Sequence, residues 1–376
     1  MPQQGRNVTK RLIELDVLRG LLLLMMVVNH SPSPLRRLTD QPVGFFSTAE
    51  GFVFVSAFLA GMLFQKRSER LGFDAARSAT VSRAIRIYRM HLTTVLFAFC
   101  VGSFFLAQLP GMQNILDPFL KNPRTATYAS LALIFQPPLM DILPMYILFS
   151  LLTPLAFWSA RRWGWKSVFF ASVALWLLSQ FHVRDLLVSA AKGFPFVNFG
   201  PFDLLSWQLL WIGGLIFGRS LQEKKPVLRL TIWSELILLA LGIGFLVWRW
   251  TSIYINVDPS KDFWFLDKWH LGPLRVLNFF VVAWFISKLL PVVNRWRGTL
   301  RPLSLVGQNL LPVFAIQICL SLIMVGWLDT GEGADWLSTI LVLCQLVTVF
   351  LAAWFFDWWA RAKVNSRTHP SPIPAT

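Results

Sequence analysis

The 376-residue sequence has few charged residues for its length. Only 14% of its residues are charged, whereas a soluble domain averages roughly 25%. Hydrophobic residues make up 55%, and 18 Trp and 33 Phe are among them. This composition excludes a pair of soluble domains and predicts a polytopic membrane protein.

Cysteine is also scarce, and its positions exclude two further classes. Cys100, Cys319 and Cys344 all fall inside apolar stretches. Neither a disulfide framework nor the close Cys and His spacing of a metal site is present. We therefore expect buried thiols, and no metal.

The first apolar stretch lacks the features of a cleavable signal peptide. Basic residues precede it, but it ends in "NHSPSP", which contains no A-x-A-like cleavage site. We expect a retained first span.

Ten apolar windows approach the length of about 20 residues that a bilayer-spanning helix requires. They cover roughly 13–30, 45–64, 90–109, 142–160, 167–181, 203–220, 230–249, 274–290, 303–327 and 336–358. The run near 126–136 is too short to span, so it predicts a re-entrant or half helix on the outer side. The expected fold is an all-α polytopic membrane protein with one transmembrane domain over 1–360, followed by a disordered cytoplasmic tail over 361–376.

The distribution of the basic residues orients these spans. With both termini in the cytoplasm, most of the 35 Lys and Arg fall on the inside, as the positive-inside rule requires. The net charge of +16 is then a topology signal, and it needs no nucleic acid. The most basic segment, 66–89, is either an ordinary positive-inside loop on anionic lipid or a site for a phosphate-bearing ligand. Arg83, Arg86 and Arg89, spaced by three, would form that site.

The first span carries a polar stripe that lipid alone does not explain. Arg19 and His30 are 11 residues apart, so they share a helix face and lie about 16 Å apart along its axis. Asp16 lies one turn before Arg19, at the spacing of an ion pair. Ionisable residues inside a span usually face a protein interior or a wet cavity. Two simpler readings stay open: His30 as a helix-end residue at the lipid interface, and Asp16–Arg19 as a structural pair.

Glu50, near the start of the second span, lies at a depth similar to that of His30. A carboxylate beside a histidine fixes the imidazole tautomer and supports general-base catalysis. Alternatively, Ser47 and Glu50 have the S-x-x-E spacing of a capping box, in which Glu50 would only close the start of its helix.

The order of several sequence blocks resembles that of a known family. Arg19 and His30 within "LDVLRGLLLLMMVVNH" look like the first-helix signature of the integral membrane acyltransferases of the family-3 superfamily. The further blocks "STAEGFVFVSAFLAGM", "RIYRMH", "DILPMYILFSLLTP", "NFGPFDLLSWQLLWIGG", "LGPLRVLNFF" and "VGQNLLPVFAIQ" resemble the OpgC-type branch, which is named for succinyl modification of osmoregulated periplasmic glucans. The resemblance extends from residue 15 to about 317. One departure is Ser56–Ala57, where the family commonly has Ser-Gly.

The resemblance implies transfer of an acyl group, succinyl or acetyl, from cytosolic acyl-CoA to a periplasmic carbohydrate hydroxyl across a bacterial inner membrane. His30 would be the general base, Glu50 would orient it, and Arg19, paired with Asp16, would hold the coenzyme arm or the packing below it. A covalent acyl-histidine step stays open. Arg83, Arg86 or Arg89 would bind the nucleotide end of acyl-CoA.

We expect the outer loops to bind the acceptor, because aromatic platforms with polar partners suit sugars. An interfacial aromatic belt explains any single Trp equally well. The residues concerned are Asp141, Tyr146, Asn198, Phe199, Asp203, Trp207, Gln208, Trp264, Trp269 and Arg275. Arg275 would hold an acyl carboxylate such as that of succinyl.

Two other functions compete with the enzyme. A transporter of a small anionic or sugar-linked solute would show paired inverted halves with broken helices. Pro144, Pro154 and Pro312 interrupt spans, but no paired halves are evident. A scaffold subunit with a structural polar core is the third reading.

Overall fold

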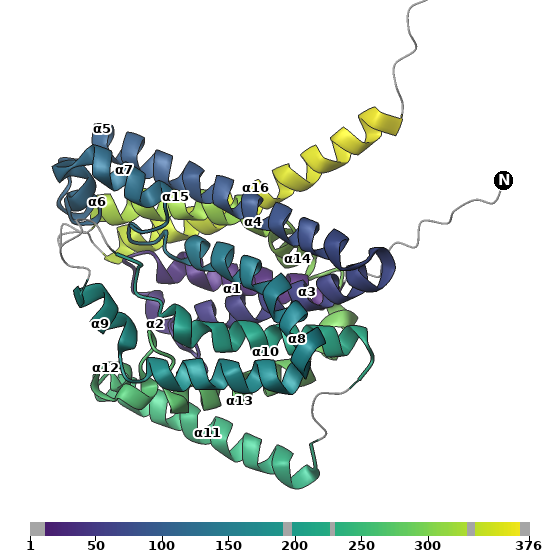
Figure 1. Ribbon diagram of the computed structural model, residues 1–376. Helices are drawn as coiled ribbons and strands as arrows, with labels where there is room; N and C mark the ends of the chain where they lie inside the picture. The colour runs from purple at the N-terminus through teal and green to yellow at the C-terminus, as the bar shows by residue number, and fades with distance from the viewer. Residues whose placement is uncertain (1–11, 191–197, 226–229, 329–334, 369–376) are drawn as a thin grey trace, which may run out of the picture.

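The computed structural model describes residues 12–190, 198–225, 230–328 and 335–368. Its long helices run side by side across Figure 1. Within these ranges the only β pairing is one bridge between Phe135 and Asn198, and eight helices are long and apolar enough to cross a membrane. The predicted all-α polytopic membrane protein is therefore confirmed.

Each expected span falls largely on helix. The long helices are α1 (Ile13–Asn29), α3 (Thr48–Leu71), α4 (Phe73–Phe97), α8 (Ile142–Ser179), α10 (Leu204–Gln222), α11 (Ile232–Tyr254), α13 (Pro273–Val293), α15 (Leu310–Leu328) and α16 (Asp335–Thr368). α4 continues through the π-helical turn η1 (Ala98–Gly102) into α5 (Ser103–Phe105). α8 contains two of the expected spans, which are separated by a kink at Gly164. The backbone there has φ 84° and ψ 159°, a conformation that glycine adopts without a Cβ clash.

Short helices mark the two ends of the bundle. At the left of Figure 1 lie α2 (Arg36–Thr39), α6 (Pro110–Lys121), α7 (Pro123–Leu131), α9 (Val183–Ala190) and α12 (Pro259–Asp262), near the short η2 (Trp264–Leu266). We call this the loop-rich end. α7 corresponds to the half helix expected near 126–136, although it ends at Leu131. α6 was not predicted from the sequence. At the opposite end α3 meets α4 and α8 bends; we call it the basic end after Arg67, Arg70 and Arg161.

α1 is fixed to α14 (Arg301–Gln308), a short helix that follows η3 (Asn294–Trp296). The expected span 303–327 is broken after α14, at Asn309. A Cβ on Gly307 would collide with the backbone oxygen of Asp16, and one on Gly20 would collide with that of Leu303. Glycine at such contacts lets helix backbones approach closely. The backbone of α1 is thus held close to that of α14.

Ala57, where the family commonly has glycine, lies in a contact between two helices. α3 packs along α10, and a Cβ on Gly214 of α10 would collide with the Cβ of Ala57. Ser56, its neighbour, lines a cavity described below. The departure therefore concerns packing between α3 and α10.

α16 runs beyond the bundle at the right of Figure 1. It continues through 361–368, residues that the sequence assigned to a disordered tail. That part of the prediction needs correction, because the helix propagates past the apolar segment. The remainder of the expected tail, 369–376, lies outside the described residues.

Candidate active site

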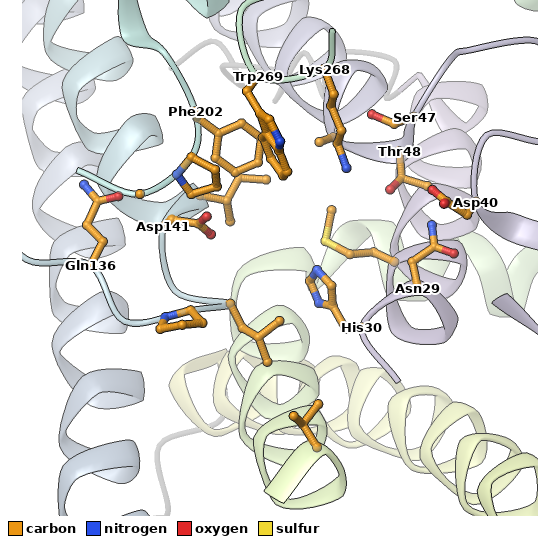
Figure 2. Close-up of a pocket in the computed structure, with 18 of the residues that line it drawn as sticks. Asn29, His30, Asp40, Ser47, Thr48, Gln136, Asp141, Phe202, Lys268 and Trp269 are labelled. Atoms are coloured by element: carbon orange, nitrogen blue, oxygen red, sulfur yellow. The ribbon is translucent and has the colours of Figure 1, made fainter. Parts of the chain in front are cut away.

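A cavity of about 800 Å³ lies at the loop-rich end, next to the end of α1. Such a volume falls in the range of roughly 300–1,000 Å³ that small-molecule sites occupy. Figure 2 shows His30, Thr48, Asp141 and Lys268 arranged around this space. They come from the end of α1, the start of α3, the turn before α8 and the loop before α13. We call it the His30 cavity.

His30 is positioned by the end of its own helix. α1 stops at Asn29, and Pro32 follows two residues after His30; a proline cannot continue the helical hydrogen bonding. The imidazole Nδ1 lies 3.0 Å from Nε2 of Gln317 on α15. No hydrogen bond joins Nε2 of His30 to another described residue, so this nitrogen is the one available to a substrate.

Gln317 belongs to a polar network inside α15 and α16. Its Nε2 lies 3.0 Å from Ser321 Oγ, which also accepts a 2.9 Å hydrogen bond from Gln345 Nε2. Gln345 in turn accepts a 3.0 Å hydrogen bond from Ser31 Oγ, next to His30. The imidazole is thus held through Gln317, which is itself fixed by neutral amides and hydroxyls of α15, α16 and Ser31.

The orientation of the Gln317 amide decides the chemistry of His30. Its Oε1 is buried without a hydrogen-bond partner, and a 180° rotation of the amide would bring Oε1 to Nδ1. In that orientation Nδ1 donates and Ser321 Oγ can donate to the same oxygen. Nε2 of His30 then carries the free lone pair that a general base requires.

Two groups of opposite charge face His30 across the cavity. Burial raises the pKa of Asp141 to about 6, and burial together with the nearby Arg275 charge lowers the pKa of Lys268. The Lys268 ammonium lies 4.9 Å from the ring centre of Trp269. The cavity therefore offers a carboxyl group that can carry a proton near neutral pH and a partly desolvated cation.

Glu50 and Arg275 are paired with each other, which corrects the positions expected for both. Both side chains are fully buried, and Arg275 Nε donates to Glu50 Oε1. Glu50 Oε2 also accepts a 3.0 Å hydrogen bond from the Ser47 backbone N–H, completing the capping box. No contact between Glu50 and His30 is found among the described residues. The short side chain of Glu50 already has two partners, and the Arg275 charge is neutralised before any substrate binds.

Arg19 lines a second, inner cavity of about 330 Å³ together with Arg83, Arg86 and Tyr146. Arg19 Nη1 lies 3.7 Å from Asp16 Oδ1, as the i,i+3 spacing predicted. This Arg19 cavity shares Met26 and Ile142 with the His30 cavity. The two spaces are therefore neighbours, one directly below the other along α1.

A third cavity, of about 460 Å³, reaches the basic end. Its cations are Lys66, Arg67, Arg70, Arg83 and Arg86. Leu63, Arg83 and Arg86 also line the Arg19 cavity, so the three cavities form a row through the bundle. We call this third space the basic cavity. Arg89, one helical repeat further along α4, is exposed and lines none of the three.

The expected acceptor residues separate in the structure. Asp141 lines the His30 cavity, but Tyr146, one turn further along α8, lies in the Arg19 cavity. Trp207 is fully buried, and its Nε1 donates to the Trp269 carbonyl at 2.9 Å. Gln208 bonds to Ser172 of α8 through both ends of its amide. Gln208 therefore ties α10 to α8, and Trp207 ties α10 to the loop that carries Trp269.

The structure also brings in residues that the sequence interpretation missed. Lys268 stands two places before His270, in a loop that the sequence analysis placed on the outer side, where it resembled any other cation. Gln317 and Ser321 are polar residues four apart in an otherwise apolar helix, and that spacing on one face was a usable signal. No sequence spacing connected three further polar residues of the His30 cavity, because they meet only in the folded chain. These are Asn29, Asp40 and Gln136.

A model of the family described as OpgC protein matches residues 11–361. Searches of curated proteins and of solved structures found no match. The family match spans all three cavities and every helix that lines them, and the chain therefore belongs to the OpgC family of membrane acyltransferases.

Proposed function

We propose that the protein transfers an acyl group, succinyl by preference, from cytosolic acyl-CoA to a hydroxyl of a periplasmic glucan or another glycan. Its place would be the bacterial inner membrane, with the basic end in the cytoplasm. The observation that carries this proposal is the row of cavities from Arg83 and Arg86 at the basic end to His30 at the loop-rich end.

The basic cavity suits the polyanionic end of acyl-CoA. Its five cations surround a space of about 460 Å³, and phosphate oxygens form strong charge-assisted hydrogen bonds with Arg and Lys. The thiol arm would extend through the smaller Arg19 cavity, whose lining is apolar apart from its arginines, Ser56 and Tyr146. The thioester would then lie near Met26 and Ile142, where that cavity meets the His30 cavity.

The transfer itself needs one base and a bound acceptor. Nε2 of His30 takes the proton of the acceptor hydroxyl, and the oxygen attacks the thioester carbonyl. The tetrahedral intermediate collapses, the C–S bond breaks, and the leaving thiolate takes the proton from the imidazolium. Gln317, as the positioning residue, holds the ring with Nδ1 away from the substrate.

Lys268 replaces Arg275 as the group that would bind a succinyl carboxylate. Arg275 is fully buried against Glu50 and lines none of the three cavities, whereas Lys268 lines the His30 cavity. A partly desolvated ammonium gains more from a carboxylate than one in water does, because the local dielectric is lower. This contact favours succinyl over acetyl.

The test is the acyl content of periplasmic glucans in cells that carry His30→Gln. Gln retains polar contact at this position but cannot act as a base. We expect wild-type protein to yield acylated glucans by mass spectrometry and the variant, shown to be folded by size-exclusion chromatography, to yield none. Full acylation by the variant would overturn the assignment of His30. Movement of labelled glycan across vesicles without acyl-CoA would instead support a transporter.

A further inference from the structure

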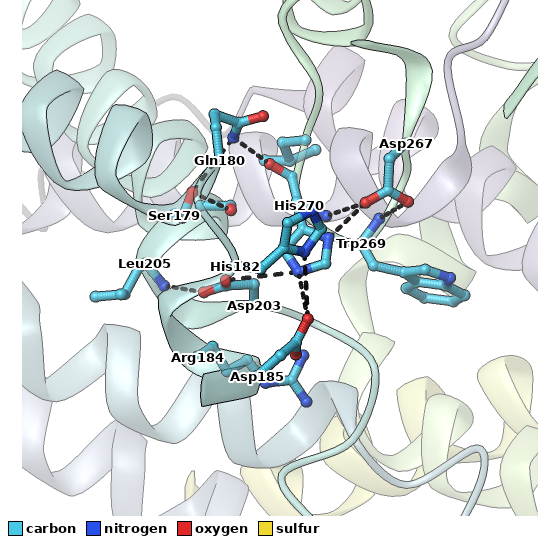
Figure 3. A network of polar contacts seen from close by, with 12 residues as sticks. Ser179, Gln180, His182, Arg184, Asp185, Asp203, Leu205, Asp267, Trp269 and His270 are labelled. Atoms are coloured by element: carbon cyan, nitrogen blue, oxygen red, sulfur yellow. Dashed lines mark hydrogen bonds and ion pairs between the residues drawn. The ribbon is translucent and has the colours of Figure 1, made fainter. Parts of the chain in front are cut away.

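A second group of titratable residues lies at the loop-rich end, outside the three cavities. His182 and Asp185 flank the start of α9, Asp203 precedes α10, and Asp267 and His270 lie in the loop before α13. Figure 3 shows these side chains converging from three segments. His182 and His270 are 88 residues apart, so sequence spacing could not associate them.

The distances within this group match those between ligands of one metal ion. His182 Nδ1 lies 3.2 Å and His270 Nε2 lies 3.5 Å from Asp185 Oδ2. All three atoms lie within 4.8 Å of one another. A tetrahedral Zn²⁺ ion with bonds of about 2.0–2.1 Å places its ligand atoms roughly 3.3–3.4 Å apart. The three atoms therefore need little movement to share an ion.

His270 also has the support that metal-binding histidines usually have. Its Nδ1 lies 2.5 Å from Asp267 Oδ2, and Asp267 accepts backbone hydrogen bonds from Trp269 at 3.1 Å and from His270 at 3.0 Å. A carboxylate that receives the other ring N–H fixes the tautomer of a ligating histidine. Here it directs the Nε2 lone pair toward Asp185 and Asp203.

Asp203 provides an independent observation. Its side chain is 1% exposed, and its Oδ2 lies 4.0 Å from His270 Nε2. Neither atom has a hydrogen-bond partner in the described part of the chain, although Asp203 Oδ1 accepts the Leu205 N–H at 2.8 Å. Buried polar atoms are nearly always satisfied, and an ion bound between these two atoms would satisfy both.

We propose that His182, Asp185 and His270 bind one divalent transition-metal ion, with Zn²⁺ the best match, and that Asp203, whose Oδ2 lies outside this group of three, moves in as the fourth ligand. Two imidazole nitrogens with two carboxylate oxygens suit Zn²⁺, whereas Ca²⁺ and Mg²⁺ prefer oxygen ligands alone. Four protein ligands make a closed, structural site. The ion would join the segment before α9, the start of α10 and the loop that carries Lys268 and Trp269, and so stabilise one wall of the His30 cavity.

Metal content tests the site without any assumption about the acyl transfer. The full-length protein in detergent would be loaded with Zn²⁺, desalted and measured by inductively coupled plasma mass spectrometry. We expect one Zn²⁺ per chain in the wild type, and a loss of bound Zn²⁺ in His270→Ala and in Asp185→Asn. Asp267→Asn should weaken Zn²⁺ binding roughly 10- to 100-fold, as changes to such supporting carboxylates do. Asp262→Asn, an exposed carboxylate on α12, is the matched control and should bind as the wild type does.

Thermal unfolding supplies the second readout. A chelator should lower the Tm of the wild type and of Asp262→Asn, and leave the Tm of Asp185→Asn unchanged. Asp185 is more than half exposed, so this variant keeps the test valid if His270→Ala fails to fold. Equal Zn²⁺ content in the wild type and Asp185→Asn, or wild-type protein without retained Zn²⁺, would overturn the proposal.

Discussion

Breaking the buried pair between Glu50 and Arg275 should destabilise the protein far more than it affects the chemistry at His30. Glu50→Gln keeps the shape of the side chain and removes its charge. The Arg275 cation then stays fully buried, with Nη2 already lacking a hydrogen-bond partner and Nη1 bonded only to the Leu266 carbonyl at 3.2 Å.

The size of the effect follows from the burial of both partners. Removing one member of a buried ion pair costs roughly 3–5 kcal/mol, since the other charge is left uncompensated. Glutamine also serves at the third position of a capping box, so the cap with Ser47 should persist and the loss should come from the uncompensated charge. Replacing both charges, in Glu50→Gln with Arg275→Met, removes the uncompensated charge and should recover much of the loss.

Thermal unfolding in detergent, with acyl transfer measured on the same samples, separates the two roles of Glu50. We expect both single variants to lower Tm strongly and the double variant to have a higher Tm than either. Folded Glu50→Gln protein, assayed well below its Tm, should retain acyl transfer. A wild-type Tm combined with lost transfer would refute this reasoning and restore Glu50 as the partner of His30.

Four further variants test the proposed roles of cavity residues. Arg83→Ala should raise the KM for acyl-CoA about tenfold or more in steady-state assays, while Arg89→Ala, on the same helix but outside the cavities, should leave it unchanged; equal effects would contradict the basic-cavity site. Lys268→Met should lower kcat/KM for succinyl-CoA relative to acetyl-CoA in a competition assay, and an unchanged ratio would remove Lys268 from acyl recognition. Gln317→Ala should lower kcat with little change in the KM for acyl-CoA, because it orients the base without touching the donor; a KM effect alone would contradict this. Burial raises the Asp141 pKa from 3.8 to about 6, so the folded state binds this proton more tightly than the unfolded state does. Wild-type stability should therefore fall as the pH rises between those values, and Asp141→Asn should abolish this pH dependence. Unfolding measured at pH 4.5 and pH 7 would show or disprove it.

The sequence was informative about features that depend on local pattern. Apolar windows predicted the spans because lipid requires continuous hydrophobicity over a fixed length. The spacing of Asp16 and Arg19 predicted their ion pair because a helix repeats every 3.6 residues. The S-x-x-E pattern predicted the capping box of Ser47 and Glu50, and the structure contains it.

The sequence could not predict which residues of distant segments contact each other. Glu50 has similar depth to His30, yet it contacts Arg275, which lies 225 positions later. Tyr146 and Trp207 looked like surface aromatics but face the interior, because rotation of α8 and α10 is set by packing. No periodicity within one helix reports which neighbour its polar face meets.

By itself, then, the sequence determined an all-α polytopic membrane protein and its likeness to the OpgC family, and it predicted that Arg19 and His30 share one face of the first helix. Only the tertiary structure decided that Gln317 rather than Glu50 contacts His30, that Lys268 lines the cavity and that His182 meets His270. The physical reason is the range of the forces involved. Hydrophobicity and helix periodicity act along the chain, whereas hydrogen bonds, ion pairs and metal coordination act over a few ångströms between residues that folding alone brings together.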